Sequence, residues 1–218
     1  MMEVLYEDNH IIIVNKKPGD ITQGDKTGDE PLSEKIKKFI KRRDKKPGNV
    51  FIGTVHRLDR PVSGAIIFAK TSKALQRLNK MFQNKEIRKT YWAKCTDIPI
   101  IEHQKLVHFL VKDSSRNKTY AHDKEVSKGK KSELIYTHLK NNQIKNLLEV
   151  KPLTGRPHQI RVQLSSIGCV IVGDIKYGAP SANKDKSICL HAKIIEFIHP
   201  VSKKKIAIQA PTPHQNWK

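Results

Sequence analysis

The sequence predicts an α+β fold in one domain, residues 1–218, with a mixed, mainly antiparallel sheet and flanking helices. Segments with strand character outnumber those with helical periodicity, and most follow one another at the short spacing of hairpins. No strand–helix alternation repeats along the chain and no Gly-x-Gly-x-x-Gly occurs, which argues against a doubly wound parallel sheet. The 218 residues are enough to bury a compact core.

Two short strands are expected within residues 4–14, on either side of the turn-prone Glu-Asp-Asn-His. Residues 16–31 are rich in Gly, Asp and Pro and predict a loop. A helix is expected over 31–42, because its apolar residues fall on one stripe and its lysines on the other side. Two acids and a proline suit the start of this helix. The apolar stripe consists of Leu32, Ile36, Phe39 and Ile40.

Strands at 49–55 and 65–70 flank a polar motif, and a capped amphipathic helix follows over 71–84, with Thr71 or Ser72 as its cap. The inward residues of this helix are Ala74, Leu75, Leu78 and Phe82. A helix within 158–168 should end at Gly168, and the last six residues should fray. The remaining strands are expected at 90–95, 105–113, 132–139, 143–150, 169–172, 188–198 and 204–210.

The chain is strongly basic. It has 42 Lys and Arg against 21 Asp and Glu, a formal net charge of +21. Such an excess favours a polyanionic partner through phosphate contacts and counterion release. The alternative explanation of the charge is a proteome-wide bias toward lysine. Clustering argues against it, because the basic residues gather at 35–46, 128–131 and 203–205. The helix at 31–42 uses its lysines either to contact that partner or as a plain solvated face.

The three cysteines, Cys95, Cys169 and Cys189, lie far apart and form no Cys-x-x-Cys. This spacing argues against a zinc ribbon or a disulfide framework and fits small core residues in a reducing cytosol. The N-terminus has no basic flank followed by an apolar stretch, and no apolar run approaches the roughly 18 residues of a membrane span. We expect a soluble, cytoplasmic protein that makes no use of a membrane.

One carboxylate, Asp59, is crowded by cations in the stretch Thr-Val-His-Arg-Leu-Asp-Arg-Pro. Arg57 and Arg60 flank it and His56 lies close by. If these side chains converge, they keep the acid ionised, ready to attack or to accept a proton. On an extended segment Arg57 and Asp59 share a face while the leucine between them faces the core. The following Ser-Gly is expected to turn into a buried strand, which places the motif in a loop at a strand edge. A structural salt bridge explains these residues as well as catalysis does.

A second motif, Pro-Leu-Thr-Gly-Arg-Pro-His-Gln-Ile-Arg, precedes and opens the helix expected within 158–168. His158, Arg161 and Ser165 fall on one side of that helix. The apolar residues on the opposite side, Ile160, Leu164 and Ile167, anchor it in the core. The helix start, with Arg156 nearby, suits a phosphate. Arg161 is either a catalytic or phosphate-binding cation on a rigid element or a solvated arginine.

A third motif, Arg-Lys-Thr-Tyr-Trp-Ala-Lys at 88–94, interleaves Tyr91 and Trp92 with basic residues. A tyrosine on a strand is usually a packing residue. The basic neighbours also resemble a surface on which a nucleic-acid base stacks.

These motifs occur in a distinctive order. His-Arg-Leu-Asp-Arg-Pro-Val-Ser-Gly, Lys-Thr-Tyr-Trp-Ala-Lys, the segment 152–178 and Leu-His-Ala at 190–192 resemble the successive motifs of the RluA family of RNA pseudouridine synthases. The opening segment resembles the start of that catalytic domain, so the resemblance runs from about Glu3 to Pro211. It implies the pseudouridine synthase catalytic-domain fold and an RNA substrate, either rRNA or tRNA. The implied reaction breaks the N-glycosidic bond of a chosen uridine and rejoins the base through carbon 5, without metal or organic cofactor.

The resemblance also implies residue roles. Asp59 is the catalytic carboxylate, and whether it attacks ribose C1′ or acts on the C2′ proton stays open. Tyr91 stacks on the target base and removes the carbon-5 proton. Arg161 pairs with the aspartate, and Arg57 fills the gap left by the flipped uridine. The neighbouring basic residues His56, Arg60, Arg156 and His158 are expected to bind substrate.

The chain departs from the family pattern in two ways. Val62 stands where a threonine is usual, which should cost a hydrogen bond at most. The catalytic motifs begin at residue 3, leaving no room for an S4 RNA-binding domain, so RNA affinity is expected from the domain itself, acting as a monomer. The rival interpretations are a non-catalytic RNA-binding protein with the same fold and a ribosome-associated structural protein.

Overall fold

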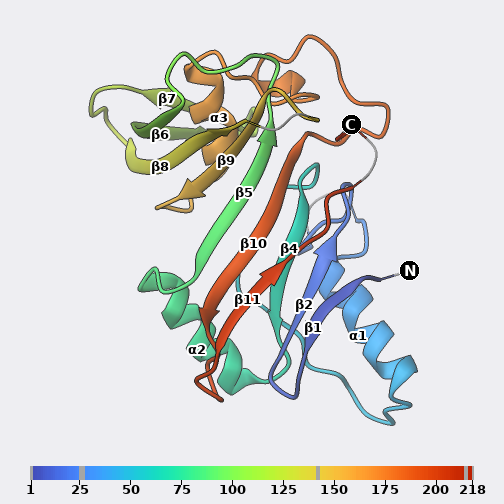
Figure 1. Ribbon diagram of the computed structural model, residues 1–218. Helices are drawn as coiled ribbons and strands as arrows, with labels where there is room; N and C mark the ends of the chain where they lie inside the picture. The colour runs from blue at the N-terminus through green and yellow to red at the C-terminus, as the bar shows by residue number, and fades with distance from the viewer. Residues whose placement is uncertain (1, 25–27, 141–142, 214–215, 218) are drawn as a thin grey trace. The chain divides into compact units, whose positions relative to one another are not determined.

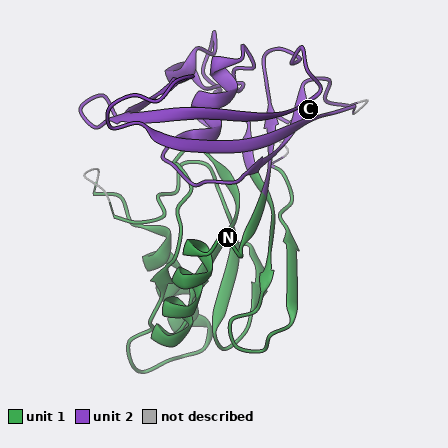
Figure 2. Ribbon diagram, turned by 90° about the vertical axis from the view of Figure 1, so that its left-hand side faces the viewer, with its two compact units in different colours: residues 1–89, 192–212 green, residues 90–191, 213–218 purple. Residues whose placement is uncertain are grey.

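The structure is a computed structural model that describes residues 2–24, 28–140, 143–213 and 216–217. The chain divides into two compact units, as Figure 2 shows: unit 1 is residues 1–89 and 192–212, and unit 2 is residues 90–191 and 213–218. Strands and few helices make up both units, which confirms the expected α+β class. The expectation of one domain stays a prediction. No helix of the described residues is long and apolar enough to cross a membrane.

Unit 1 is built on a sheet in which every pair of defined register is antiparallel (Figure 1). Its strands, in spatial order, are β1 (Val4–Glu7), β2 (Ile11–Lys16), β4 (Ser63–Ala69), β10 (Leu190–Ile198) and β11 (Lys205–Gln209), with the two-residue β3 (Gly53–Thr54) beside β4. All seven residues of β4 are buried, and so are the first four of β2. These strands therefore read as continuous apolar runs because both of their faces are covered.

The two helices of unit 1 lie where the sequence predicts them. α1 (Leu32–Arg43) buries the expected Leu32, Ile36 and Ile40, but its N-cap is Pro31, expected one position further in. α2 (Ser72–Gln83) is capped by Thr71, whose Oγ1 accepts a hydrogen bond from the Ala74 N–H at 3.1 Å. The core of unit 1 gathers side chains of β2, β4, α2 and β10, including Ile11, Ile13, Ile67, Leu78, Ile195 and Phe197.

Gly64 fixes how closely β4 approaches β10. Its φ is +117°, and a Cβ at this position would lie 2.4 Å from the Ala192 carbonyl oxygen and 2.5 Å from the Ala192 nitrogen. Only glycine fits, because the obstructing atoms belong to a backbone that cannot move aside. The Ser-Gly and Leu-His-Ala segments therefore contact each other through their backbones, at Gly64 and Ala192, although these residues are 128 positions apart in the sequence.

The strands of unit 2 are again antiparallel in every pair of defined register. Its strands, in spatial order, are β5 (Arg88–Lys94), β9 (Leu147–Pro152), β8 (Lys130–Leu139), β6 (His103–Asp113) and β7 (Lys118–His122). The helix α3 (Gln159–Ser166) packs against β6 and β7. β7 and a short 3-10 helix, η1 (Ile175–Tyr177), are not among the elements expected from the sequence.

The expected strand at 169–172 is wrong. Only Ile171 takes part in β pairing, through an isolated bridge to Cys95. The reason lies in the preceding helix: the Cys169 N–H donates to the Leu164 carbonyl at 3.0 Å, after Gly168 (φ +79°) has closed α3 as expected. The chain leaves the helix too late to form a strand here.

The three cysteines are buried and free, as expected. Burial raises the pKa of each thiol, most strongly that of Cys95, so these groups are inert core side chains. Of the residues 213–218 expected to fray, 214–215 and 218 lie outside the described ranges.

Candidate active site

Asp59 lies in the loop 55–62 between β3 and β4, as expected. Leu58 is buried, Arg57 is exposed and Asp59 is half-buried. The buried hydroxyl of Thr22 bonds both backbone groups of Leu58, accepting from its N–H and donating to its carbonyl at 3.3 Å each. The loop is therefore anchored one residue before its carboxylate.

The turn that follows Asp59 begins earlier than expected. The Val62 N–H donates to the Asp59 carbonyl at 3.0 Å, so the turn spans 59–62 and centres on the Arg-Pro pair. The expected turn at Ser63-Gly64 is wrong, because these two residues already belong to β4. Val62 is 2% exposed, so its apolar side chain belongs to the interior.

Lys16, at the end of β2, lies beneath this loop. Its side chain is 1% exposed and its Nζ donates to three carbonyls, those of Val62 at 2.7 Å and of Lys17 and Arg60 at 3.1 Å. Burial lowers the Lys16 pKa to about 8, although the nearby charges of Asp20 and Asp59 oppose the shift. The ammonium thus holds both ends of the turn that begins at Asp59. Sequence reasoning missed it, because a lysine in a Lys-Lys-Pro-Gly segment is usually solvated.

Replacing Lys16 with methionine is expected to loosen the loop. Three carbonyls lose their donor, one of them in a buried hydrogen bond, at a cost of about 2 kcal/mol or more in unfolding free energy. Trypsin should then cut the 57–58 peptide bond faster, since the exposed Arg57 no longer lies on a fixed backbone. Urea unfolding and timed digestion measure both effects. Lys17→Met, which changes an exposed side chain, is the control and should stay within about 0.5 kcal/mol; equal behaviour of the two variants contradicts the anchoring role.

His56 is a neutral, half-buried ring that ties the loop to β4. Its Nε2 accepts from the Ile67 N–H at 3.1 Å, which leaves the proton on Nδ1, and its ring centroid lies 4.8 Å from that of Phe82. Burial, reinforced by the charge of Lys89, lowers the His56 pKa to about 3. Its expected contact with substrate stays a prediction; the contacts described here are structural.

The pH dependence of folding should report on His56. The ring is neutral in the folded chain down to about pH 3, whereas in the unfolded chain it binds a proton below about pH 6.5. Folding stability therefore falls as pH falls through this window, by up to about 1.4 kcal/mol per pH unit. In His56→Gln this contribution is absent. Urea unfolding of both chains between pH 4 and 7 measures the difference, and parallel pH profiles contradict it.

Of the two arginines beside Asp59, Arg60 contacts an acid of the preceding loop. Its Nη2 lies 2.5 Å from Asp29 Oδ2, and both side chains are more than a third exposed. The pair joins the turn to the segment before α1, and at this exposure it adds little stability. Arg57 is exposed. The substrate-binding roles of both arginines stay predictions.

In unit 2, Arg161 is a buried cation held by a buried acid. Its Nε donates to Asp174 Oδ2 at 2.7 Å and its Nη2 to Oδ1 at 2.8 Å, and the two side chains are 6% and 1% exposed. The guanidinium carbon lies 5.0 Å from the centroid of the Tyr177 ring. The solvated-arginine interpretation is therefore wrong. Bidentate pairing fixes the plane of the guanidinium as well as its position.

His158 reaches the same cluster through Tyr177. It is the N-cap of α3, in the left-handed region at φ +54°, so the helix starts one residue later than expected. Its Nδ1 lies 2.8 Å from the Tyr177 hydroxyl, which also accepts from the Thr119 N–H of β7 at 2.9 Å. The sequence analysis named neither Asp174 nor Tyr177, although both lie in Gly-Asp-Ile-Lys-Tyr-Gly at the end of the segment 152–178.

The start of α3 is less open to a phosphate than expected. The Arg156 N–H donates to the side-chain oxygen of Gln159 at 3.0 Å, and the Thr154 hydroxyl donates to the same oxygen at 2.8 Å. The Arg156 N–H is thus already hydrogen-bonded within the chain and is not available to a phosphate. The side chain of Arg156 is exposed, and its contact with substrate stays a prediction.

Tyr91 lies on β5, opposite Val150 of β9, and is 7% exposed. The neighbouring Trp92 is half-buried. Little of the Tyr91 ring faces solvent, so the stacking of a base on it stays a prediction, as does the pairing of Arg161 with Asp59. Within the units, the structure brings Asp59 together with Lys16, and Arg161 together with His158 through Tyr177.

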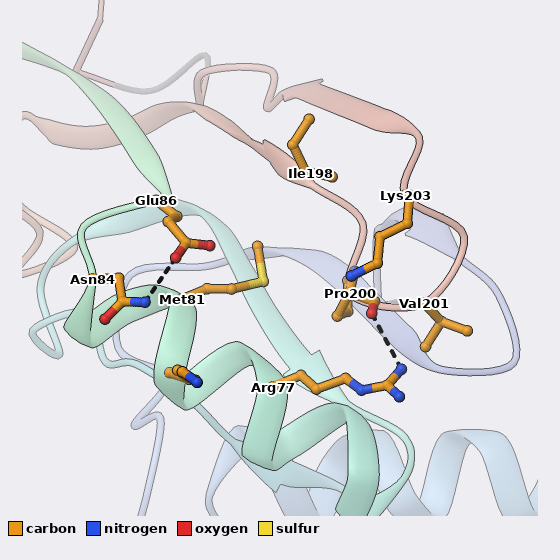
Figure 3. Close-up of a pocket in the computed structure, with 9 residues that line it drawn as sticks. Arg77, Met81, Asn84, Glu86, Ile198, Pro200, Val201 and Lys203 are labelled. Carbon is orange, nitrogen blue, oxygen red and sulfur yellow. Dashed lines mark hydrogen bonds between the residues drawn. The ribbon is translucent and has the colours of Figure 1, made fainter.

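A pocket of about 500 Å³ in unit 1 contains none of these residues (Figure 3). It lies between α2 and the turn that joins β10 to β11. Arg77, Lys80 and Lys203 give it a basic rim around the apolar Met81 and Ile198. The Arg77 guanidinium is held by the Pro200 carbonyl at 3.2 Å.

Two solved structures share this fold. "Human RNA Pseudouridylate Synthase Domain Containing 4" superposes with a TM-score of 0.80 over 97% of this chain and 89% of that one, at 20% identity. "Human RNA Pseudouridylate Synthase Domain Containing 1" superposes with a TM-score of 0.74 over 98% and 84%, at 22% identity. At such identities the likeness defines the fold alone.

The sequence comparisons define the family. The RNA pseudouridylate synthase family model matches residues 10–166. "Ribosomal large subunit pseudouridine synthase C" of Buchnera aphidicola subsp. Baizongia pistaciae is 36% identical, over 95% of this chain and 66% of its own. "tRNA pseudouridine synthase C" of Vibrio vulnificus is 30% identical, over 96% and 90%. The chain belongs to the RNA pseudouridylate synthase family, which confirms the resemblance, and it spans about two thirds of the length of the Buchnera relative.

Proposed function

We propose that this chain is an RNA pseudouridine synthase that isomerises specific uridines of rRNA, tRNA or both, with Asp59 as its catalytic carboxylate. The observation that carries the proposal is the construction of the Asp59 loop. A buried ammonium and a buried hydroxyl fix the backbone on both sides of the acid. Burying a charge is costly unless it is paired or hydrogen-bonded, and this ammonium is held by three carbonyls. Family membership supplies the reaction class. The names of the relatives, which refer to the ribosomal large subunit and to tRNA, support the two RNA classes.

In the proposed reaction the N1–C1′ bond of the uridine breaks and a bond between C5 and C1′ forms. Asp59 either attacks C1′ or takes the C2′ proton to begin this exchange. Tyr91 removes the proton from C5, which passes to solvent, and N1 gains a proton from solvent, so that the product is an isomer of the uridine. No metal or organic cofactor is needed, because no atom is added and no electron leaves the nucleoside.

Two positively charged groups are proposed to support Asp59. Lys16 lies close enough to act on the charge of the carboxylate as well as on its loop. The role of Arg161 as the partner of Asp59 is taken from the family resemblance. Its ion pair with Asp174 supports this role, because a guanidinium held along one edge keeps a fixed orientation. Arg57, His56, Arg60, Arg156 and His158 are proposed to contact the RNA. The protein is proposed to act as a monomer in the cytoplasm.

Release of tritium tests the proposal. RNA transcribed with uridine labelled at carbon 5 loses its label to water only when the base is rejoined through that carbon. The purified chain is expected to release tritium from labelled rRNA and tRNA that have been transcribed in vitro. A chain that binds this RNA tightly and releases no tritium is instead the non-catalytic RNA-binding protein that the sequence leaves as the alternative.

A further inference from the structure

One face of the sheet in unit 2 is left open by α3. Residues alternate between the two faces of β6: Leu106, His108 and Leu110 are buried, and Leu110 packs with Val162 of α3. The residues between them point to the opposite face, where Val107 is 40% exposed. We call this surface the open face; its central residues are Val107, Phe109, Tyr120, His122, Lys105 and Lys131.

Aromatic rings gather on the open face at adjacent positions. His122 of β7 is the register partner of Phe109 of β6, and Phe109 is in turn the partner of Lys131 of β8. Tyr120 lies two residues before His122, on the same face, and is 36% exposed. Residues two apart on a strand lie about 7 Å apart, a spacing at which successive bases of an extended single strand can each meet a ring.

Positive charge surrounds these rings. Lys105 and Lys131 lie 2.9 and 3.7 Å from one carboxylate, that of Glu133, so the three together carry a net positive charge. From 105 to 131 the chain has eight basic and three acidic residues. Lys118 also lies 5.7 Å from the centroid of the Tyr120 ring. Protein-binding surfaces are depleted of lysine, whereas lysines interleaved with aromatic rings are typical of single-stranded nucleic-acid binding.

We propose that the open face binds a single-stranded segment of RNA, with bases on Tyr120 and His122 and phosphates on Lys105, Lys118 and Lys131. Four-stranded sheets bind RNA in this way when aromatic residues stand on their exposed face. The inference rests on the proposed function in one respect, that the partner is RNA. It adds a surface that none of the motif residues belongs to.

Anisotropy of a fluorescein-labelled 12-nucleotide oligouridine tests the stacking. Tyr120→Leu combined with His122→Ala should weaken binding by the full chain about tenfold or more, because stacking contributes strongly to affinity for single strands. Tyr120→Phe keeps the ring and should bind as the unchanged chain does. Phe51, 45% exposed in unit 1, supplies the matched control: Phe51→Leu should leave the affinity unchanged. Circular dichroism confirms that each variant is folded.

The phosphate contacts are tested by salt. Lys105→Gln with Lys131→Gln should lower the slope of log affinity against log salt by about 1 to 1.5, whereas the aromatic variants should keep the slope of the unchanged chain. The inference is overturned if Tyr120→Leu with His122→Ala binds oligouridine normally, or if Phe51→Leu loses as much affinity. In the first case the open face serves another partner, such as a protein.

The same proteins separate this inference from the proposed function. Tritium release at saturating RNA should be unchanged in Tyr120→Leu with His122→Ala, while the RNA concentration for half-maximal rate rises. If oligouridine binding depends on the rings of Tyr120 and His122 but the chain never releases tritium, the RNA-binding role of the open face is supported and the proposed enzyme activity is refuted. If the chain releases tritium but its oligouridine binding does not depend on these rings, the enzyme activity is supported and the RNA-binding role of the open face is refuted.

Discussion

Replacing Asp59 with asparagine is expected to abolish tritium release while the chain stays folded. Asparagine has nearly the same size and keeps the loop backbone, but it can neither attack C1′ nor accept the C2′ proton. The loss should be at least a thousandfold, the range in which removing a catalytic acid or base falls. Because Asp59 is half-buried and Lys16 holds the loop through backbone carbonyls rather than through the carboxylate, the free energy of unfolding should change by about 1 kcal/mol or less.

Single-turnover tritium release, with enzyme in excess over RNA, measures this loss without interference from product release. Asp29→Asn is the matched control, since it removes another acid of unit 1 that contacts the same turn through Arg60. It should retain nearly full activity. Normal release by Asp59→Asn contradicts the assignment of the catalytic carboxylate, whichever of the two chemical routes the enzyme takes.

Breaking the ion pair between Arg161 and Asp174 should destabilise unit 2 more than any exposed pair would. Asp174→Asn leaves a buried guanidinium without its counter-charge, at a cost of about 3–5 kcal/mol. Arg161→Ala leaves a buried carboxylate in the same situation. Loss of activity in either single variant therefore mixes a catalytic effect with a folding effect.

The double variant Arg161→Met with Asp174→Leu separates the two effects. Removing both charges together should restore most of the stability, since apolar replacement of a buried pair is often neutral. If Arg161 acts in catalysis, tritium release by this variant stays low although the chain is stable. Urea unfolding and single-turnover release, measured side by side, decide the matter. A stable and fully active double variant shows that the pair is structural only.

The elements that the sequence predicts well are those whose side chains divide clearly between apolar and polar. α2 lies within a residue of its expected bounds, and its cap is one of the two residues named. Met81 was overlooked on its buried stripe, because methionine is less diagnostic of burial than leucine. β7 was overlooked since Lys-Thr-Tyr-Ala-His is short and mostly polar. The run 169–172 was misread as a strand because apolar residues signal burial, and burial alone does not specify pairing.

The candidate site shows a sharper limit. The ordered motifs and the resemblance they carry single out Asp59 and Arg161 as candidates, but the groups that hold them, Lys16 and Asp174, are charged residues whose burial no local pattern signals. Each is buried because residues beyond its neighbours in sequence supply partners: the carbonyls of Arg60 and Val62 for the ammonium, and a helix for the carboxylate. Contacts of this kind depend on tertiary structure, so a linear reading cannot contain them.

The hydrogen bond from Thr119 to Tyr177 has a mechanical consequence. Thr119 and Tyr120 are neighbours on β7 and face opposite ways, so the strand that carries one proposed base contact also donates the bond that seats Tyr177 beneath Arg161. A nucleotide that stiffens β7 is therefore expected to restrain the Tyr177 hydroxyl as well. Slower deuterium uptake at the Thr119 amide in the presence of oligouridine would register that stiffening directly.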